Sequence, residues 1–154
     1  KIASDEIYRR QYDILCDELK AAGYHHYEIS NFALPGFEAI HNSAYWSGHS
    51  YVGLGPGAHS YDAARGVRAW NTTTPHGWSQ ESETLTRRQL ATEEIMLRLR
   101  TSEGIPLQRL EELSGEKAIA RSLRLGAIVC TCGQIRIPED HFFVSEDIIS
   151  DLIV

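Results

Sequence analysis

Apolar residues follow a helical spacing at the start of the chain and change their period after Gly23. From Ile7 to Ala22 they recur every three to four residues, which is typical of an amphipathic helix. Ser4-Asp5-Glu6 supplies a cap with acids in the first turn, and Gly23 stands where a left-handed C-cap is expected. From His25 to Ile29 the period becomes two, which predicts a short strand. A helix, a glycine and a strand form half of a β/α repeat.

The next stretch concentrates glycine, aromatic and histidine residues. Its local patterns predict four segments: a loop over Asn31–Gly36, a helical turn over His41–Trp46, and strands over Tyr51–Leu54 and Gly66–Asn71. The polar residues that follow predict a domain boundary between 72 and 84. One helix with two or three strands cannot bury its strands alone. Residues 1–78 are therefore expected to be the end of a larger β/α sheet or barrel.

Residues 84–154 have a mainly helical pattern. Thr86-Arg87-Arg88-Gln89 fits a capping box for a helix that continues to Arg100. Two shorter helices are expected around Leu107–Leu113 and Ile119–Leu123, then a hairpin that turns at Cys132-Gly133, and a last helix from Ser145. This order predicts a small winged-helix-like second domain.

Composition and charge narrow the function. The 154 residues are 42% apolar and 23% charged, typical of a globular protein, and carry a net charge of −6. An acidic chain lacks the footprint of a general nucleic-acid binder, and no apolar run is long enough to cross a bilayer. The cysteines Cys16, Cys130 and Cys132 follow no disulfide or zinc spacing, which favours a reducing cytoplasm. The chain begins KIASDEIY, without Met or a signal peptide, so we expect a fragment.

Several motifs together carry a family resemblance. The strings YEISNFALPG, HNSAYW and YVGLGPGAHS, followed by Arg68-x-x-Asn71, resemble the oxygen-independent coproporphyrinogen III oxidase-like family of radical S-adenosylmethionine proteins, and within it the haem chaperone branch. The segment from Glu94 to Ile105 and the ending RIPEDHFFVSEDIISDLIV are also similar to that family. The resemblance therefore covers nearly the whole chain.

The resemblance implies an α/β fold, the end of an incomplete β/α barrel, followed by the winged-helix-like domain. It also implies a [4Fe–4S] cluster on a C-x3-C-x2-C triplet, with S-adenosylmethionine on the open iron. This chain has no such triplet, so we expect it to hold no cluster and to contain no catalytic residue of its own. It would be the C-terminal part of a longer polypeptide.

The resemblance also suggests roles for single residues. The HNxxYW element implies haem contact by His41, Asn42, Tyr45 and Trp46, with His41 as an axial iron ligand; the alternative is that they satisfy loop backbone and fill core. Cofactor contact is expected at Gly53, Gly55, Gly57 and Glu28. For the glycines the alternative is a tight turn, and for Glu28 it is a partner in Arg68 or the backbone.

The remaining polar residues are expected to have mainly structural roles. Arg68 and Asn71 are expected to brace the last barrel strand, and Ala58-His59-Ser60 lacks the context of a serine-hydrolase triad. Five other histidines are expected to be surface or structural residues: His25, His26, His49, His76 and His141. Lys117, Arg121 and Arg124 are placed like a recognition helix, but acids lie close to them, so a lid over the barrel mouth or plain packing is the better expectation.

The favoured function is a haem chaperone that delivers haem to an acceptor protein, with haem or coproporphyrinogen III as the tetrapyrrole. The first alternative is an oxygen-independent coproporphyrinogen III oxidase. The second, from another class, is a winged-helix interaction or DNA-binding module that would depend on residues 86–154 alone.

Overall fold

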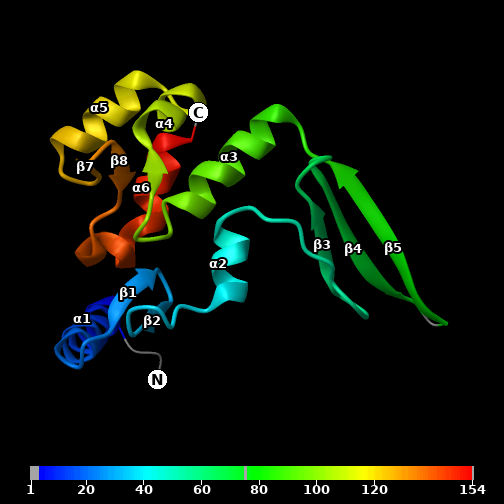
Figure 1. Cartoon of the computed structure of the whole chain (residues 1–154), viewed down its shortest axis with the longest axis horizontal. Coiled ribbons are helices and arrows are strands. Elements are labelled where there is room, and N and C mark those ends of the chain that lie inside the picture. Colours follow the sequence, from blue (N-terminus) through cyan, green and yellow to red (C-terminus); the bar gives the residue numbers. More distant parts are fainter. Residues whose placement is uncertain (1–3, 75, 154) are drawn as a thin grey trace.

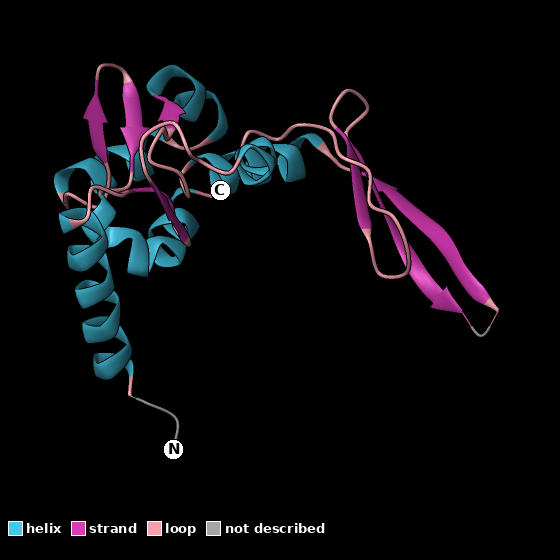
Figure 2. Ribbon diagram, turned by 60° about the horizontal axis from the view of Figure 1, so that its bottom comes forward, coloured by secondary structure: helices cyan, strands magenta, loops and turns pink. Residues whose placement is uncertain are grey.

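A computed structural model describes residues 4–74 and 76–153 as a mixed α/β structure. A helical C-terminal unit lies above the first helix and two short strands, and a three-stranded sheet extends away from both (Figure 1). The view in Figure 2 shows the same sheet standing apart, reached by loops and by the helix α3. The mixed α/β character predicted from the sequence is confirmed.

The N-terminal elements form as their local patterns predict. Helix α1 (Asp5–Ala21) has Ser4 at its N-cap, and Gly23 has a φ of 86° just after its end. Strand β1 (His25–Glu28) follows and pairs in antiparallel fashion with β2 (Asn31–Ala33). The prediction of a loop from Asn31 onward was wrong, because a turn and a register shift next to Glu28 bring Asn31–Ala33 back along β1.

The middle of the chain consists of a short helix and a sheet. Helix α2 (Ile40–Trp46) contains the HNxxYW element. Strands β3 (His59–Asp62), β4 (Val67–Thr74) and β5 (Gly77–Thr84) form an antiparallel sheet in the order β3-β4-β5. The strand predicted over Gly66–Asn71 is therefore confirmed as part of β4.

One prediction for this region was wrong. Of the strand expected over Tyr51–Leu54, the structure shows only an isolated bridge between Tyr51 and Tyr61. The polar residues around the predicted domain boundary form the end of β4 and the whole of β5, with Thr74 opposite Gly77, and the boundary itself stays a prediction. Antiparallel pairing gives this polar segment the backbone hydrogen bonds that a linker would take from water.

The C-terminal unit has four α-helices, one 3-10 helix and three short strands among the described residues. The α-helices are α3 (Arg87–Arg98), α4 (Leu107–Leu113), α5 (Glu116–Arg124) and α6 (Ser145–Leu152), and Glu139–Val144 forms the 3-10 helix η1. The strands β6 (Ile105–Pro106), β7 (Val129–Thr131) and β8 (Gln134–Arg136) form a sheet in the order β6-β8-β7.

The main hydrophobic core lies inside this unit. It includes eleven side chains that are almost fully buried: Ile95, Leu99, Ile105, Leu110, Ile119, Ile128, Ile135, Ile137, Phe142, Ile149 and Leu152. The capping box of Thr86 and Gln89 is present and begins α3 as predicted. The hairpin turns at Cys132 and Gly133, both with positive φ, also as predicted. At these two places the local sequence signals agree with the structure.

Backbone hydrogen bonds join the first strand to the C-terminal unit. The N–H of Ile29 donates to the Arg100 carbonyl at 3.0 Å, and the N–H of Ser102 donates to the Tyr27 carbonyl at 3.0 Å. Among the described residues, no helix combines the length and the apolar character needed to cross a bilayer. Helix α2 lies between the β3-β4-β5 sheet and the C-terminal unit to which β1 is hydrogen-bonded (Figure 1).

Candidate functional site

The four HNxxYW residues lie on two neighbouring faces of the short helix α2. The His41 side chain is exposed, and its ring meets the Tyr45 ring edge-on with 4.7 Å between centroids. Its imidazole makes no hydrogen bond with the described residues. The half-buried Asn42 follows it on the same helix. The imidazole of His41 is thus available to a ligand from outside.

An aromatic row continues from His41 toward the sheet. The Tyr45 ring lies 4.5 Å from Tyr51, and Tyr51 lies 6.3 Å from Tyr61 on β3. Burial raises the pKa of both Tyr51 and Tyr61 above its usual value. At neutral pH these two residues therefore present hydroxyl groups, which can donate hydrogen bonds, rather than phenolates.

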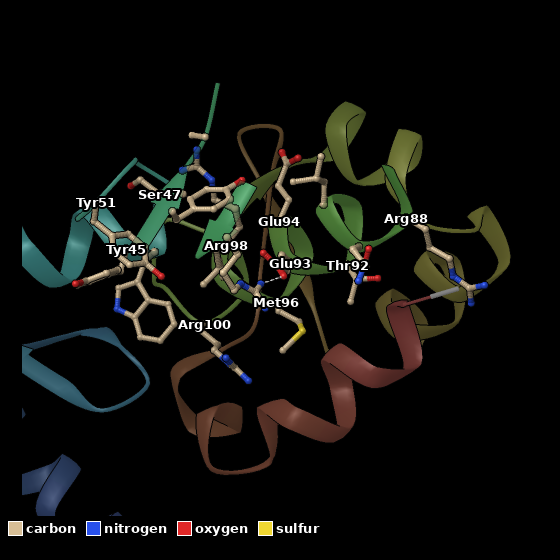
Figure 3. A pocket seen from close by; sticks show the side chains of 18 of the residues that line it. Tyr45, Ser47, Tyr51, Arg88, Thr92, Glu93, Glu94, Met96, Arg98 and Arg100 are labelled. Carbon is tan, nitrogen blue, oxygen red and sulfur yellow. Dashed lines mark hydrogen bonds and ion pairs between the residues drawn. The ribbon is translucent and has the colours of Figure 1, made fainter. Parts of the chain in front are cut away.

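The aromatic row forms one wall of a groove of about 980 Å³, which we call the α2–α3 groove. Tyr45 and Trp46 line it from α2, Tyr61 and Arg68 from the sheet, and residues of α3 form the opposite side (Figure 3). Its volume is in the range of small-molecule sites. Of the four HNxxYW residues, Tyr45 and Trp46 line this groove, whereas His41 and Asn42 are not among its lining residues.

A second cavity of about 640 Å³ lies beside α2 and shares Trp46 and Arg98 with the groove. The indole Nε1 of Trp46 is buried and has no hydrogen-bond partner among the described residues. A buried donor without a partner is costly. Trp46 therefore separates two hollows and offers an unused hydrogen bond close to both.

The glycines of the Tyr51–Gly57 segment meet the needs of their own backbone. A β-carbon at position 53 would overlap with the carbonyl group of His59, while Gly55 and Gly57 have φ values of 91° and 74°. Asn71, buried on β4, donates from its amide to the Gly55 carbonyl at 2.9 Å, and its own carbonyl accepts from the Gly57 N–H at 2.8 Å. This is the tight-turn alternative left open by the sequence.

The carboxylate of Glu28 also has partners within its own part of the chain. Its side chain is fully buried and accepts hydrogen bonds from the Ser30 N–H at 3.1 Å and from the Asn31 side-chain amide. The backbone partner considered for it is therefore present, whereas Arg68 pairs with Glu83 and Glu93 instead. Glu28 thus has a partner within the chain, and its contact with a cofactor stays a prediction.

Arg68 joins the sheet to α3. The hydrogen bond to Glu93 and the nearby carboxylates raise the pKa of Arg68 further above its usual value. Together with Asn71, it has the bracing role that the sequence suggested. The other histidines are structural or exposed: His25 contacts Glu38 at 3.0 Å, and His26 is buried against Phe32.

The residues of this chain fit haem but do not fit an iron–sulfur cluster. For haem there is an unengaged, exposed imidazole, an aromatic edge beside it, and exposed apolar neighbours in Phe37 and Ile40, which are 80% and 87% accessible. For a cluster, the three cysteines lie on α1, on β7 and in the turn after it. No group of three potential metal ligands occurs within residues 4–74 and 76–153.

Sequence reasoning did not predict that arginines gather at this site. Five arginines line the α2–α3 groove: Arg68, Arg88, Arg98, Arg100 and Arg109. The available signal was their density between positions 87 and 109 in an acidic chain.

Comparisons with known proteins agree with the motif resemblance. Residues 85–124 match the family described as "HemN C-terminal domain". The chain is 35% identical over 126 residues to "Heme chaperone HemW" of Mycobacterium tuberculosis, covering 75% of this chain and 32% of that protein. It is 36% identical over 131 residues to "Radical S-adenosyl methionine domain-containing protein 1, mitochondrial" of Danio rerio, covering 75% and 30%. The chain thus spans about a third of these relatives.

A solved structure has a similar fold. It is described as "Coproporphyrinogen III oxidase (HemN) from Escherichia coli is a Radical SAM enzyme" and matches with a TM-score of 0.71 and 12% identity. The match covers 99% of this chain and 42% of that one. At this identity, the similarity concerns the fold alone.

Proposed function

Because this chain is a member of the family that contains the HemN and HemW radical S-adenosylmethionine proteins, we propose that it forms the haem-contacting part of a haem chaperone. The observation that carries this proposal is His41. Its imidazole is exposed on α2, is unengaged by the described residues, and lies edge-on to Tyr45. An exposed imidazole without a hydrogen-bond partner is a suitable axial ligand of haem iron. Bound iron would supply the coordination bond, while this chain supplies the ligand and the apolar surface around it.

The names of the relatives support the chaperone over the oxidase. Several proteins at about 35% identity are called "Heme chaperone HemW", whereas the similarity to coproporphyrinogen III oxidase extends to the fold alone. S-adenosylmethionine and a [4Fe–4S] cluster belong to this proposal as cofactors of the longer proteins, because the cysteines described here do not fit a cluster. Release of haem to an acceptor protein is likewise part of the proposal.

We also propose a more specific fold for each of the two parts of the chain. The order α3-β6-α4-α5-β7-β8 supports a winged-helix-like domain within residues 84–154, and residues 1–78 are proposed to complete a β/α barrel. A DNA-binding role has little support, because Arg121 on α5 lies 3.7 Å from Asp151 and the chain is acidic. A cytoplasmic location stays a prediction; the Danio rerio relative carries "mitochondrial" in its name.

Haemin titration of the purified protein tests the proposal. Coordination by His41 predicts that His41→Ala changes the Soret band of the bound haemin and weakens binding, while His49→Ala, an exposed histidine in the following loop, leaves both unchanged. The same spectrum and affinity in His41→Ala as in the wild type would remove His41 from the site. Formation of a decarboxylated porphyrinogen from coproporphyrinogen III by the longer, cluster-containing protein, with S-adenosylmethionine and a reductant, would instead favour the oxidase.

A further inference from the structure

The α2–α3 groove has a charge opposite to that of the chain. The protein carries a net charge of −6, but five arginines and two glutamates line this groove. Its other wall is aromatic, with Tyr45, Trp46 and Tyr61 among the lining residues. A cationic side facing an aromatic side suits a ligand that is both flat and anionic.

Most of these arginines are already neutralised by carboxylates of the chain. Arg68 pairs with Glu83 and Glu93. Arg109 contacts Glu94 at 2.6 Å and Glu112 at 2.7 Å, and Arg100 contacts Glu146 at 2.6 Å. The groove therefore owes its unbalanced positive charge to the two remaining arginines, Arg88 and Arg98.

Arg98 is the better placed of the two. It lies at the end of α3 and is half-buried, whereas Arg88 is exposed. Its guanidinium makes no ion pair or hydrogen bond with a side chain in the described part of the protein. It lines both hollows beside α2, each time together with Trp46 and Ser47. In Figure 3 the side chains of Tyr45 and Tyr51 lie on one side of Arg98, with Met96 and Thr92 on the other.

A half-buried guanidinium without a counterion loses hydration and gains no partner in exchange. Such a group is suited to an anion that arrives with a ligand, and its planar fork matches a carboxylate in two-pronged fashion. We propose that Arg98 binds a carboxylate of a planar, apolar ligand that lies against the aromatic wall formed by Tyr45, Tyr51 and Tyr61. Given the proposed function, on which this step depends, the ligand class is a tetrapyrrole and the anion is one of its propionate groups. Arg98 would thereby orient the macrocycle relative to His41.

Metal-free porphyrins test this inference separately from iron coordination. The full chain is titrated by fluorescence with metal-free mesoporphyrin, which has two carboxylates, and with its dimethyl ester, which has none. The wild type is expected to bind the diacid at least about tenfold more tightly than the diester, as one charge-assisted hydrogen-bonded pair implies. Arg98→Gln should lose that preference, and Arg124→Gln, a surface arginine on α5, should keep it.

Each result decides one point. An equal affinity of the wild type for diacid and diester overturns the inference without any variant, and so does an unchanged preference in Arg98→Gln. Should Arg98→Gln fail to fold by circular dichroism, Arg98→Lys replaces it, with a reduced preference expected because the two-pronged geometry is lost. His41→Ala should bind metal-free mesoporphyrin as the wild type does. A failure of the haemin test with an intact diacid preference would therefore reject His41 as the ligand and retain Arg98.

Discussion

Glu28 and Thr101 form an antiparallel bridge that ties the first strand of the chain to the segment directly after α3. The Glu28 side chain is fully buried beneath this junction and accepts hydrogen bonds from Ser30 and Asn31. This residue therefore holds together two parts of the chain that the sequence assigned to separate domains.

Replacing Glu28 with Ala should destabilise the protein without touching the groove. The change empties a fully buried position and removes the acceptor of the Ser30 N–H and of the Asn31 amide, so we expect a loss of about 1–3 kcal/mol in the free energy of unfolding. Urea unfolding followed by circular dichroism measures it. Glu81→Ala, on the exposed strand β5, is the control and should change stability by less than about 0.5 kcal/mol. Equal midpoints for the two variants would contradict the structural role.

The position of Gly53 distinguishes a backbone requirement from a cofactor contact. A methyl group there would overlap with the His59 carbonyl, so Gly53→Ala should lower the free energy of unfolding by about 1–3 kcal/mol. Thermal unfolding measures this loss. Val52→Ala is the control because Val52 is 80% accessible and should be nearly neutral. If Gly53→Ala kept its stability but the longer protein lost S-adenosylmethionine binding, Gly53 would be a cofactor contact and not a requirement of the backbone.

The elements that could be predicted from the sequence are those whose signals are local. The capping box at Thr86 and the Cys132-Gly133 turn each depend on residues a few positions apart, and both formed where they were expected. The HNxxYW residues were also found on one element, since they lie within six consecutive positions and need no distant partner to stay together. Helix α1 likewise followed from its own spacing and caps.

The failures were in long-range pairing. Tyr51 contributes a single bridge to Tyr61, because the real strand begins only at His59 and pairs forward with β4. Strand β5 is exposed along its whole length and therefore shows no apolar alternation that a period of two could reveal. The three threonines of Thr72–Thr74 were the signal that was overlooked, since β-branched residues favour strands. The groove arginines converge from β4, α3 and α4, and their meeting point depends on the tertiary fold.

His26 should make the stability of the protein depend on pH. Its ring stacks on Phe32 at 3.9 Å and meets Phe142 edge-on at 4.8 Å, with Tyr12 also nearby. Burial lowers the pKa of His26 below its usual value of 6.5, although the carboxylates of Glu139 and Glu28 partly oppose the shift. The native state therefore keeps this imidazole neutral at a pH at which the unfolded chain takes up a proton.

The sign of the effect follows from proton uptake. Above about pH 6.5 both states are neutral at His26 and the residue adds no pH dependence, as its usual pKa indicates. Below that pH the unfolded state binds the extra proton, so the free energy of unfolding falls by up to about 1.4 kcal/mol per pH unit until the folded pKa is reached. Urea unfolding at several pH values between 7 and 5 gives this slope. His26→Phe should show a shallower slope than the wild type whatever its absolute stability, and His49→Gln, at an exposed site, should show the wild-type slope. A wild-type slope in His26→Phe would mean that the acid sensitivity arises elsewhere, and that the buried ring of His26 takes up its proton without loss of the native packing.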